Sequence, residues 1–438
     1  MASGGYPIGG RAFHRLKWLV GGVRRRMRRI TTYARAWLHR LQSNHATFVG
    51  ITGTAGKTTA KDLTATILSA IAPCECTDRS ENDPFYVAQT ILSVRKHHRF
   101  CVVEVAASEK YRLDLPARLL KPHIAVMTLV AREHYSGFRS LQAIAAEKAK
   151  LIAALHPHGV AVLNIDDPLV RSIGERCNRR VIWVGKGEGA TLRLREARSQ
   201  WPEPLTLKVD YEGKSFDVQT QLHGTQLALS VLAALGVALA AGVPMERAIS
   251  ALLRARPAEG RMEIVTSDDG VVFVRDDWKA AHWSMQAPFE FLKTAQAQRK
   301  VAIIGSVSDS PLGPSQRYPR AARLALEAAD LVVFVGPDAL SALKAQPGAG
   351  SKSLLAFPML RDASEYLQKA LRAGDLVLLK GTNPRDHLVR LILNRNKPVQ
   401  CWREGCGLAS FCGTCPRAYA AAPASHRGAY PAIDEAVQ

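Results

Sequence analysis

The sequence predicts an α/β protein built from two sheet-containing domains. Its 438 residues exceed the size of one ordinary hydrophobic core. Short apolar runs alternate with helical patterns from Thr47 onward, and a second alternating unit starts near Arg261. Such alternation is typical of mostly parallel sheets covered by helices. We therefore expect four parts: a basic arm at 1–45, a central domain at 46–259, a smaller Rossmann-like α/β domain at 260–398, and a tail at 399–438.

The first 50 residues are strongly basic. They hold ten Lys or Arg and no Asp or Glu, in a chain whose net charge is +21. Apolar residues three or four apart between Leu16 and Leu41 predict an amphipathic helix over 11–42, with Gly21-Gly22 as a point where it could break. Two interpretations stay open: attachment to an anionic membrane surface, or packing as a solvated arm on its own domain. A removed organelle-targeting peptide is a weaker third.

The central domain follows from its local patterns. Buried apolar runs predict strands, and longer runs with a period of 3.6 residues predict helices. The runs at 205–211 and 214–222 alternate in period two around a turn at Glu212-Gly213, which indicates a small antiparallel portion. The expected strands are 48–52, 100–106, 123–130, 159–166, 180–185, 191–197, 205–211 and 214–222; the expected helices are 57–70, 140–156 and 226–242.

The second domain repeats the alternation on a smaller scale. Its apolar runs predict strands at 271–277, 300–306, 331–336, 354–358 and 375–380, and helices at 284–298 and 319–329. The Ala/Pro-rich end of the tail predicts disorder. No apolar run approaches the ~18 residues that a membrane-spanning helix needs.

A glycine-rich loop follows the first strand and opens a helix. The pattern G-x-x-x-x-G-K-[ST] would place its first glycine where this chain has Ile51, so the loop Gly53-Thr54-Ala55-Gly56-Lys57-Thr58-Thr59 is a shorter form. Consecutive backbone N–H groups at such a loop can surround phosphate oxygens at a helix N-terminus. The Lys57 ammonium can reach the β and γ phosphates of a nucleotide, and the Thr58 hydroxyl suits Mg²⁺.

The stretch G-I-T-G-T-A-G-K-T-T at 50–59 resembles the nucleotide loop of the Mur ligases, ATP-dependent amide-bond ligases that include folylpolyglutamate synthetase. Further stretches resemble landmarks of this family in the same order up to Pro398, and the branch that adds D-alanyl-D-alanine is the most similar. The resemblance implies a central P-loop ATPase domain, ATP and Mg²⁺ as cofactors, and an acyl-phosphate intermediate. It assigns nucleotide binding to the loop residues Gly53, Thr54, Gly56, Lys57, Thr58 and Thr59.

The same resemblance implies roles for residues outside the loop. Glu104 matches the strand-end metal-binding glutamate, and within 121–152 His134 matches a metal-binding histidine and Lys148 a lysine that is often carbamylated. "RPAEGRME" supplies Arg261, the arginine at the hinge between the two domains. In "VRDDWKAAHWSM", Asp276 or Asp277 matches the residue that holds the ATP ribose, and Trp278 takes a tyrosine position. "GDLVLLKGT" places Lys380 near the acyl substrate, where it could stabilise the oxyanion.

Three departures from the family pattern bear on the substrates. Only some 46 residues precede the loop strand, so we expect the uridine-nucleotide-binding N-terminal domain to be missing. Ser230 stands where the family has the asparagine that faces adenine, and Ala281-His282 replaces Asn-Pro beside the amine-substrate pocket. A typical UDP-muramyl substrate is therefore not expected.

Four cysteines cluster in the tail, at Cys401, Cys406, Cys412 and Cys415. Four thiols within fifteen residues suit a tetrahedral structural Zn²⁺ site, and such a module could dock a protein partner. Iron–sulfur ligation, redox-active thiols and chance clustering are the alternatives. The other four cysteines are scattered, which suits a reducing compartment.

Together the patterns predict a cytoplasmic ATP-dependent carboxylate–amine ligase, on the inner face of the membrane if the arm binds lipid. Its substrates would be an amino acid, a peptide or a cell-envelope precursor. The alternatives are a capsule-type poly-amino-acid synthase and, in another class, a catalytically degenerate ATP-binding scaffold. Nucleic-acid binding ranks last, because the basic residues lie on an amphipathic helix rather than among stacking aromatics.

Overall fold

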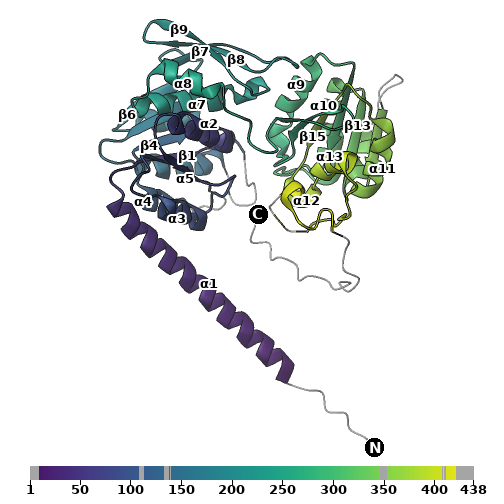
Figure 1. Ribbon diagram of the computed structural model, residues 1–438, viewed down its shortest axis with the longest axis horizontal. Helices are drawn as coiled ribbons and strands as arrows, with labels where there is room; N and C mark the ends of the chain where they lie inside the picture. Colours follow the sequence, from purple (N-terminus) through teal and green to yellow (C-terminus); the bar gives the residue numbers. More distant parts are fainter. Residues whose placement is uncertain are drawn as a thin grey trace, which may run out of the picture.

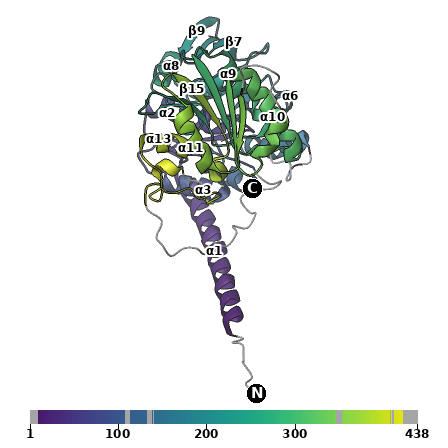
Figure 2. The ribbon, with the colours of Figure 1, turned by 90° about the vertical axis from the view of Figure 1, so that its right-hand side faces the viewer.

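The computed structural model contains two sheets, each with helices on both faces, and one long helix that projects from the first (Figures 1 and 2). It describes residues 9–107, 113–132, 138, 140–345, 353–406, 408 and 411–420. The side chains of residues 9–23 and of Arg25 lie outside this description. The predicted α/β class and mostly parallel sheets are confirmed.

The first sheet has the order β2-β3-β1-β4-β5-β6-β7-β8-β9. Pairing is parallel from β2 to β7, whereas β7, β8 and β9 pair antiparallel, as their period-two patterns predicted. The strands are β1 (Thr47–Thr52), β2 (Cys74–Cys76), β3 (Phe100–Glu104), β4 (Ile124–Met127), β5 (Val160–Asn164), β6 (Arg180–Gly185), β7 (Leu192–Arg198), β8 (Thr206–Tyr211) and β9 (Lys214–Gln219).

Alternate side chains of this sheet enter two separate cores. Val49 and Ile51 of β1 pack with α2, α7 and α8, while Phe48 packs with the helices of the opposite face. The helices of the domain are α2 (Lys57–Ser69), α3 (Pro84–Ser93), α4 (Asp114–Leu120), α5 (Leu141–Ala153), α6 (Pro168–Glu175), α7 (Ala228–Ala240) and α8 (Met245–Leu252), with the 3₁₀ turn η1 (Thr225–Leu227). Because β1 lies between β3 and β4, the loop that follows it emerges at the point where strand order reverses, the usual ligand crevice of such sheets.

The second sheet has the order β10-β11-β15-β12-β13-β14, with only β10 antiparallel. Its strands are β10 (Glu263–Thr266), β11 (Val272–Asp276), β12 (Arg299–Ile304), β13 (Leu331–Val335), β14 (Ser353–Phe357) and β15 (Asp375–Lys380). Its helical elements are η2 (His282–Ser284), α9 (Gln286–Thr294), α10 (Pro314–Ala328), η3 (Ala339–Ala345), α11 (Leu360–Ala370), α12 (Asn383–Asp386) and α13 (Val389–Asn396), and η4 (Cys412–Thr414) follows in the tail. The helix α10 begins five residues before the predicted start and includes Pro319 in its interior.

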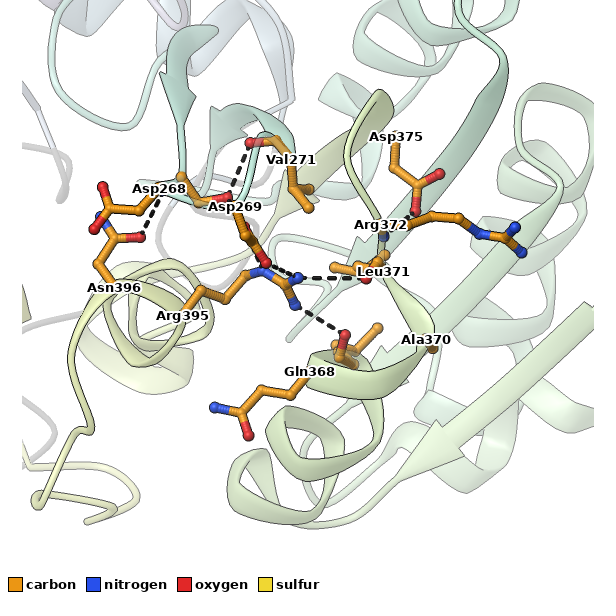
Figure 3. A network of polar contacts seen from close by, with 12 residues as sticks. Asp268, Asp269, Val271, Gln368, Ala370, Leu371, Arg372, Asp375, Arg395 and Asn396 are labelled. Carbon is orange, nitrogen blue, oxygen red and sulfur yellow. Dashed lines mark hydrogen bonds and ion pairs between the residues drawn. The ribbon is translucent and has the colours of Figure 1, made fainter.

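A buried arginine ties the β10–β11 turn to the helices of this domain (Figure 3). The Arg395 guanidinium forms an ion pair with Asp269 and donates to the carbonyls of Leu367 and Leu371 at 3.0 and 3.3 Å. The backbone N–H of Asp268 donates to the Asn396 side chain at 3.2 Å. Arg395 therefore joins the edge of the sheet to the C-termini of α11 and α13.

The basic arm forms α1 (Gly9–Gln42), which continues through Gly21-Gly22 without a break. Its C-terminal part packs against α3 and α4. There Ala36 is fully buried, and the Arg40 guanidinium donates to the carbonyls of Leu120 and Lys121 at 2.8 and 2.9 Å. The rest of the helix extends away from both domains (Figures 1 and 2). Among the described residues, no helix is both long and apolar enough to cross a membrane.

Candidate active site

The loop between β1 and α2 depends on glycine at two positions. Gly53 has φ 142°, and a Cβ atom there would lie 1.9 Å from the Thr128 hydroxyl oxygen. Gly56 has φ 77° and caps the N-terminus of α2. The Thr128 hydroxyl donates to the Ala55 carbonyl at 2.6 Å, which fixes the loop against the end of β4. The first turn of α2 therefore directs its N–H groups toward the loop, as a phosphate site requires.

Behind the loop, a group of hydroxyl and carboxylate side chains surrounds Thr58. The Thr58 hydroxyl donates to the Glu104 carboxylate at 2.8 Å and lies 3.0 Å from the Ser80 hydroxyl. The Asn82 amide donates to the other Glu104 oxygen at 2.7 Å. Glu104 is 1% exposed, so it is a buried charge held by two hydrogen bonds.

These residues fit Mg²⁺. The ion prefers oxygen donors and is usually held by one or two protein groups together with nucleotide phosphates, and the Thr58 hydroxyl and one Glu104 oxygen can supply the protein groups. Ser80 and Asn82 were not among the predicted site residues. They carry no motif of their own, and they reach the site because the loop after β2 starts at the same sheet edge as the loop after β1.

Lys57 and Lys148 contact neighbouring carbonyl groups of the loop. The Lys57 ammonium lies 3.2 Å from the Thr54 carbonyl, and the Lys148 ammonium, 1% exposed, donates to the Gly53 carbonyl at 2.9 Å. Lys148 comes from the middle of α5, which places its ammonium beside the loop, and its metal-site role stays a prediction. His134, its expected partner, lies outside the described residues.

A cavity of about 960 Å³ lies between the two domains. The central domain contributes loop residues, and the second domain contributes the ends of β11 and β15. Seven of its lining residues were singled out by their sequence: Thr54, Ala55, Gly56, Thr59, Arg261, Asp276 and Lys380.

Lys380 and Asp276 form a pair within the second domain, and Arg261 connects this domain to the central one. The Lys380 ammonium forms an ion pair of 2.6 Å with Asp276 and donates to the Lys279 carbonyl at 3.0 Å. Lys380 is only 2% exposed, so the ion pair holds its charge at the cavity wall. The Arg261 guanidinium reaches across to the Ser80 hydroxyl at 3.4 Å. Ser80 therefore links the hinge arginine to the group around Thr58.

Of the two adjacent aspartates, only Asp276 lines the cavity. Asp277 is fully buried behind it and forms an ion pair of 3.3 Å with Arg275. Burial raises the pKa of Asp277, and the positive charge of Arg275 opposes this rise. Of the two, only Asp276 is therefore placed for the predicted ribose contact, which stays a prediction. Trp278 packs against Phe411 at a ring separation of 5.2 Å, whereas Trp283 lines the cavity.

The second domain contributes apolar side chains to the lining of the cavity, such as Trp283, Pro288 and Phe291. Ser230, at the predicted adenine-facing position, donates to the Gly56 carbonyl at 3.2 Å and thus supports the loop itself. Ala281 also lines the cavity, at the position where the sequence departs from Asn-Pro.

The four tail cysteines surround one small cavity of about 20 Å³, together with His387 and Arg390. All four are free thiols. Arg390 donates to the Cys412 sulfur at 3.1 Å, and the Cys406 sulfur lies 3.1 Å from the His387 ring. Among the described residues, no group of three or more His, Cys, Asp or Glu is arranged to hold a metal ion. The predicted zinc site is therefore not supported, although the clustering is real.

The tail packs against the start of the second domain. The Phe411 ring is 1% exposed and lies under the Arg275 guanidinium at 4.6 Å, beside Gly260. A partner for this module stays a prediction.

Comparisons with known proteins agree with this geometry. The Mur ligase middle domain matches residues 51–238, and the Mur ligase glutamate ligase domain matches residues 260–383. The UDP-N-acetylmuramoyl-tripeptide–D-alanyl-D-alanine ligase of Mycobacterium leprae is 27% identical over 380 residues, which cover 80% of this chain and 74% of that protein. The corresponding ligase of Treponema pallidum is 26% identical over 337 residues, 76% of this chain and 71% of that protein.

Solved structures give the same result. A crystal structure of MurF from Acinetobacter baumannii superposes with a TM-score of 0.75 at 25% identity, covering 81% of this chain and 78% of that one. The fold is shared with the MurF ligase from Thermotoga maritima in complex with ADP, with a TM-score of 0.70, 23% identity and 80% coverage of each chain.

Proposed function

This chain belongs to the Mur ligase family of ATP-dependent amide-bond ligases, and on that premise we propose that it joins a carboxylate to an amine through an acyl-phosphate intermediate. The observation that carries the proposal is the shared cavity. The phosphate loop of one domain and the Asp276–Lys380 pair of the other face the same 960 Å³ space. A nucleotide bound at the loop would therefore share this space with a substrate bound beside Lys380.

The first half-reaction transfers the γ-phosphoryl group of ATP to the carboxylate, which forms the acyl phosphate and releases ADP. Such a transfer needs positioning and charge neutralisation more than covalent chemistry. The N–H groups of the loop and the Lys57 ammonium are suited to hold the phosphates, and Arg261 can approach from the hinge. Mg²⁺, bound by Thr58 and Glu104, would screen the charge of the phosphates.

In the second half-reaction the amine attacks the acyl carbon, the C–O bond to phosphate breaks, and the amine loses a proton as the amide forms. The carbonyl oxygen becomes an oxyanion in between. Lys380 is the donor we assign to this oxyanion, because its ammonium is buried at the cavity wall and oriented by Asp276 and the Lys279 carbonyl.

We propose that the substrates are an amino acid, a peptide or a cell-envelope precursor other than a typical UDP-muramyl substrate. Support comes from the cavity wall, where Ala281 and Trp283 give a surface different from that of the family segment, and from His282, which replaces the proline of Asn-Pro beside them. Burial and the nearby charges of Arg320 and Arg317 lower the pKa of His282, which favours a neutral ring there.

The test is phosphate release from ATP with two sets of substrates. One set offers UDP-N-acetylmuramoyl tripeptide with D-alanyl-D-alanine, and the other offers pools of amino acids and short peptides, with Lys57→Ala as the inactive control. We expect turnover that needs both a carboxylate and an amine from the second set. Turnover with the first set alone would refute the substrate proposal but retain the ligase. ATP binding without turnover in any set would refute the reaction and favour a scaffold.

The mass of the product distinguishes a ligase from the alternative function, a poly-amino-acid synthase. A ligase that adds one residue gives a single product, whereas a poly-amino-acid synthase gives a ladder of masses spaced by one residue.

A further inference from the structure

The exposed face of α1 carries a continuous apolar stripe. Five of the thirteen exposed large hydrophobic side chains among the described residues lie on this one helix, and each is 52–56% exposed. They are Met27, Ile30, Trp37, Leu38 and Leu41. Their spacing of three, seven, one and three residues places all five within a ~100° sector of the helix. Such a stripe normally faces a hydrophobic partner.

The protein's own domain does not cover this stripe. The residues that pack on α3 and α4 include Tyr33, Ala36 and Arg40, which follow a separate row. Exposed Ala34 lies on the stripe, and Ala36 lies two residues later, which is about 200° around the helix axis. The packed and the exposed rows therefore lie on different sides of the helix, and docking on the domain leaves the apolar stripe facing outward.

Basic side chains border the stripe. Arg24, Arg28 and Arg35 are exposed along one flank, and Arg26 is exposed along the other. The helix has no acidic residue in its first turn, and residues 1–50 contain ten Lys or Arg and no Asp or Glu. An apolar stripe flanked by long cationic side chains matches an interface where acyl chains lie beneath anionic headgroups. Trp37 has an apolar ring and a polar N–H, which suits a position between the acyl chains and the headgroups.

We propose that α1 is a membrane-surface anchor that lies along an anionic phospholipid leaflet with Met27, Ile30, Trp37, Leu38 and Leu41 inserted. Charge favours lipid over a second copy of the chain. Two such helices paired through their stripes would bring their flanking arginines together without acidic partners, whereas phosphate headgroups neutralise them. Nucleic acid would use the arginines but leave the apolar stripe without a role.

The anchor would also hold the ligase at the membrane. Because Arg40 and Ala36 hold the C-terminal part of α1 against the central domain, binding of the helix would orient this domain relative to the leaflet. This arrangement suits a ligase whose carboxylate substrate or product lies at a membrane surface. This role of the anchor rests on the proposed function. Membrane binding itself does not depend on catalysis.

The experiment is sedimentation of the full chain with vesicles of phosphatidylglycerol and phosphatidylcholine, and with vesicles of phosphatidylcholine alone. We expect binding to the anionic vesicles only. The variant Leu38→Asp/Leu41→Asp should weaken it at least tenfold, and Arg24→Gln/Arg28→Gln/Arg35→Gln should weaken it and reduce its salt dependence. The matched control is Leu340→Asp, because Leu340 is equally exposed, at 54%, on the other domain.

The outcomes show whether the apolar stripe of α1 binds lipid or a second copy of the chain. A wild-type chain that stays in the supernatant overturns the proposal, and so does binding that Leu38→Asp/Leu41→Asp leaves unchanged. If light scattering shows a dimer that this variant dissociates, and vesicles do not bind, the stripe is a contact between copies. Unchanged thermal unfolding of each variant shows that the fold is retained. Loss of vesicle binding with ATP turnover unchanged keeps this test separate from that of the ligase reaction.

Discussion

Replacing Glu104 with glutamine isolates the charge of the magnesium site. The side chain keeps its shape, and the new amide can still accept from Asn82 and donate to Thr58, whose hydroxyl can turn toward Ser80. Two charge-assisted hydrogen bonds become neutral ones, which costs roughly 1 kcal/mol each. Removing a buried charge offsets part of that cost. We expect the free energy of unfolding to fall by no more than about 2 kcal/mol.

Activity should fall much further. A unit charge ~4 Å from a cation, at an effective dielectric constant of ~20, contributes about 4 kcal/mol per unit of cation charge. Even if solvent and phosphates compensate half of this interaction energy for a divalent ion, the rate of phosphate release at limiting Mg²⁺ should fall by a factor of roughly 10³. The measurement is the rate of phosphate release as a function of Mg²⁺ concentration, and we expect high Mg²⁺ to restore part of the rate.

The matched control is Glu147→Gln. Glu147 is also a buried glutamate of the central domain, 3% exposed, but it accepts from the Leu113 N–H and pairs with Lys150 away from the phosphate loop. Its replacement should change stability and leave the Mg²⁺ dependence of the rate unaltered. The assignment of Glu104 is refuted if its variant keeps the wild-type Mg²⁺ dependence, or if both variants respond alike.

Three further changes test other parts of the structure. Lys380→Met should lower kcat by roughly 10²–10³ with little effect on ADP affinity, because it removes an oxyanion donor; an unchanged kcat in steady-state kinetics would refute that role. Gly53→Ala should abolish ADP binding in calorimetry, since its Cβ would lie 1.9 Å from the Thr128 hydroxyl; retained binding would show that the loop can shift. Burial, Arg40 and His156 lower the pKa of His123 to about 4. As the pH falls below ~6.5, His123 therefore takes up a proton in the unfolded chain before it does so in the folded protein. The free energy of unfolding is highest above pH ~6.5 and decreases toward pH 4, by about 1–2 kcal/mol because the ring is partly exposed. His123→Gln should flatten the pH dependence of urea unfolding in that window, and an identical slope in both proteins would contradict this explanation.

The domains and the phosphate loop could be predicted from local patterns. A strand, a glycine-rich turn and Lys57-Thr58 at a helix start form a local signal, because all the chemistry lies within a few residues. Asp276 and Lys380 were named instead through their resemblance to family segments, and each lies at the end of an apolar strand. Their ion pair follows from register, since Asp276 and Lys380 are partners on neighbouring parallel strands.

Other site contacts required the tertiary fold. Ser80 and Asn82 carry no motif of their own, and they join the site because β2 pairs with β3 at the edge where the loop also emerges. The choice between Asp276 and Asp277 depended on which side chain the strand directs into the cavity and which it directs toward Arg275.

The basic arm shows most clearly which features follow from the sequence and which follow from the tertiary structure. The sequence by itself determined that α1 is helical, amphipathic and basic, because periodicity and charge are properties of neighbouring residues. It could not determine which face is covered, since both the row with Ala36 and the row with Ala34 satisfy helical spacing. Only the tertiary structure decided this, through the contacts of Arg40 and Ala36 with α3 and α4, which bury one row and leave the larger apolar stripe exposed.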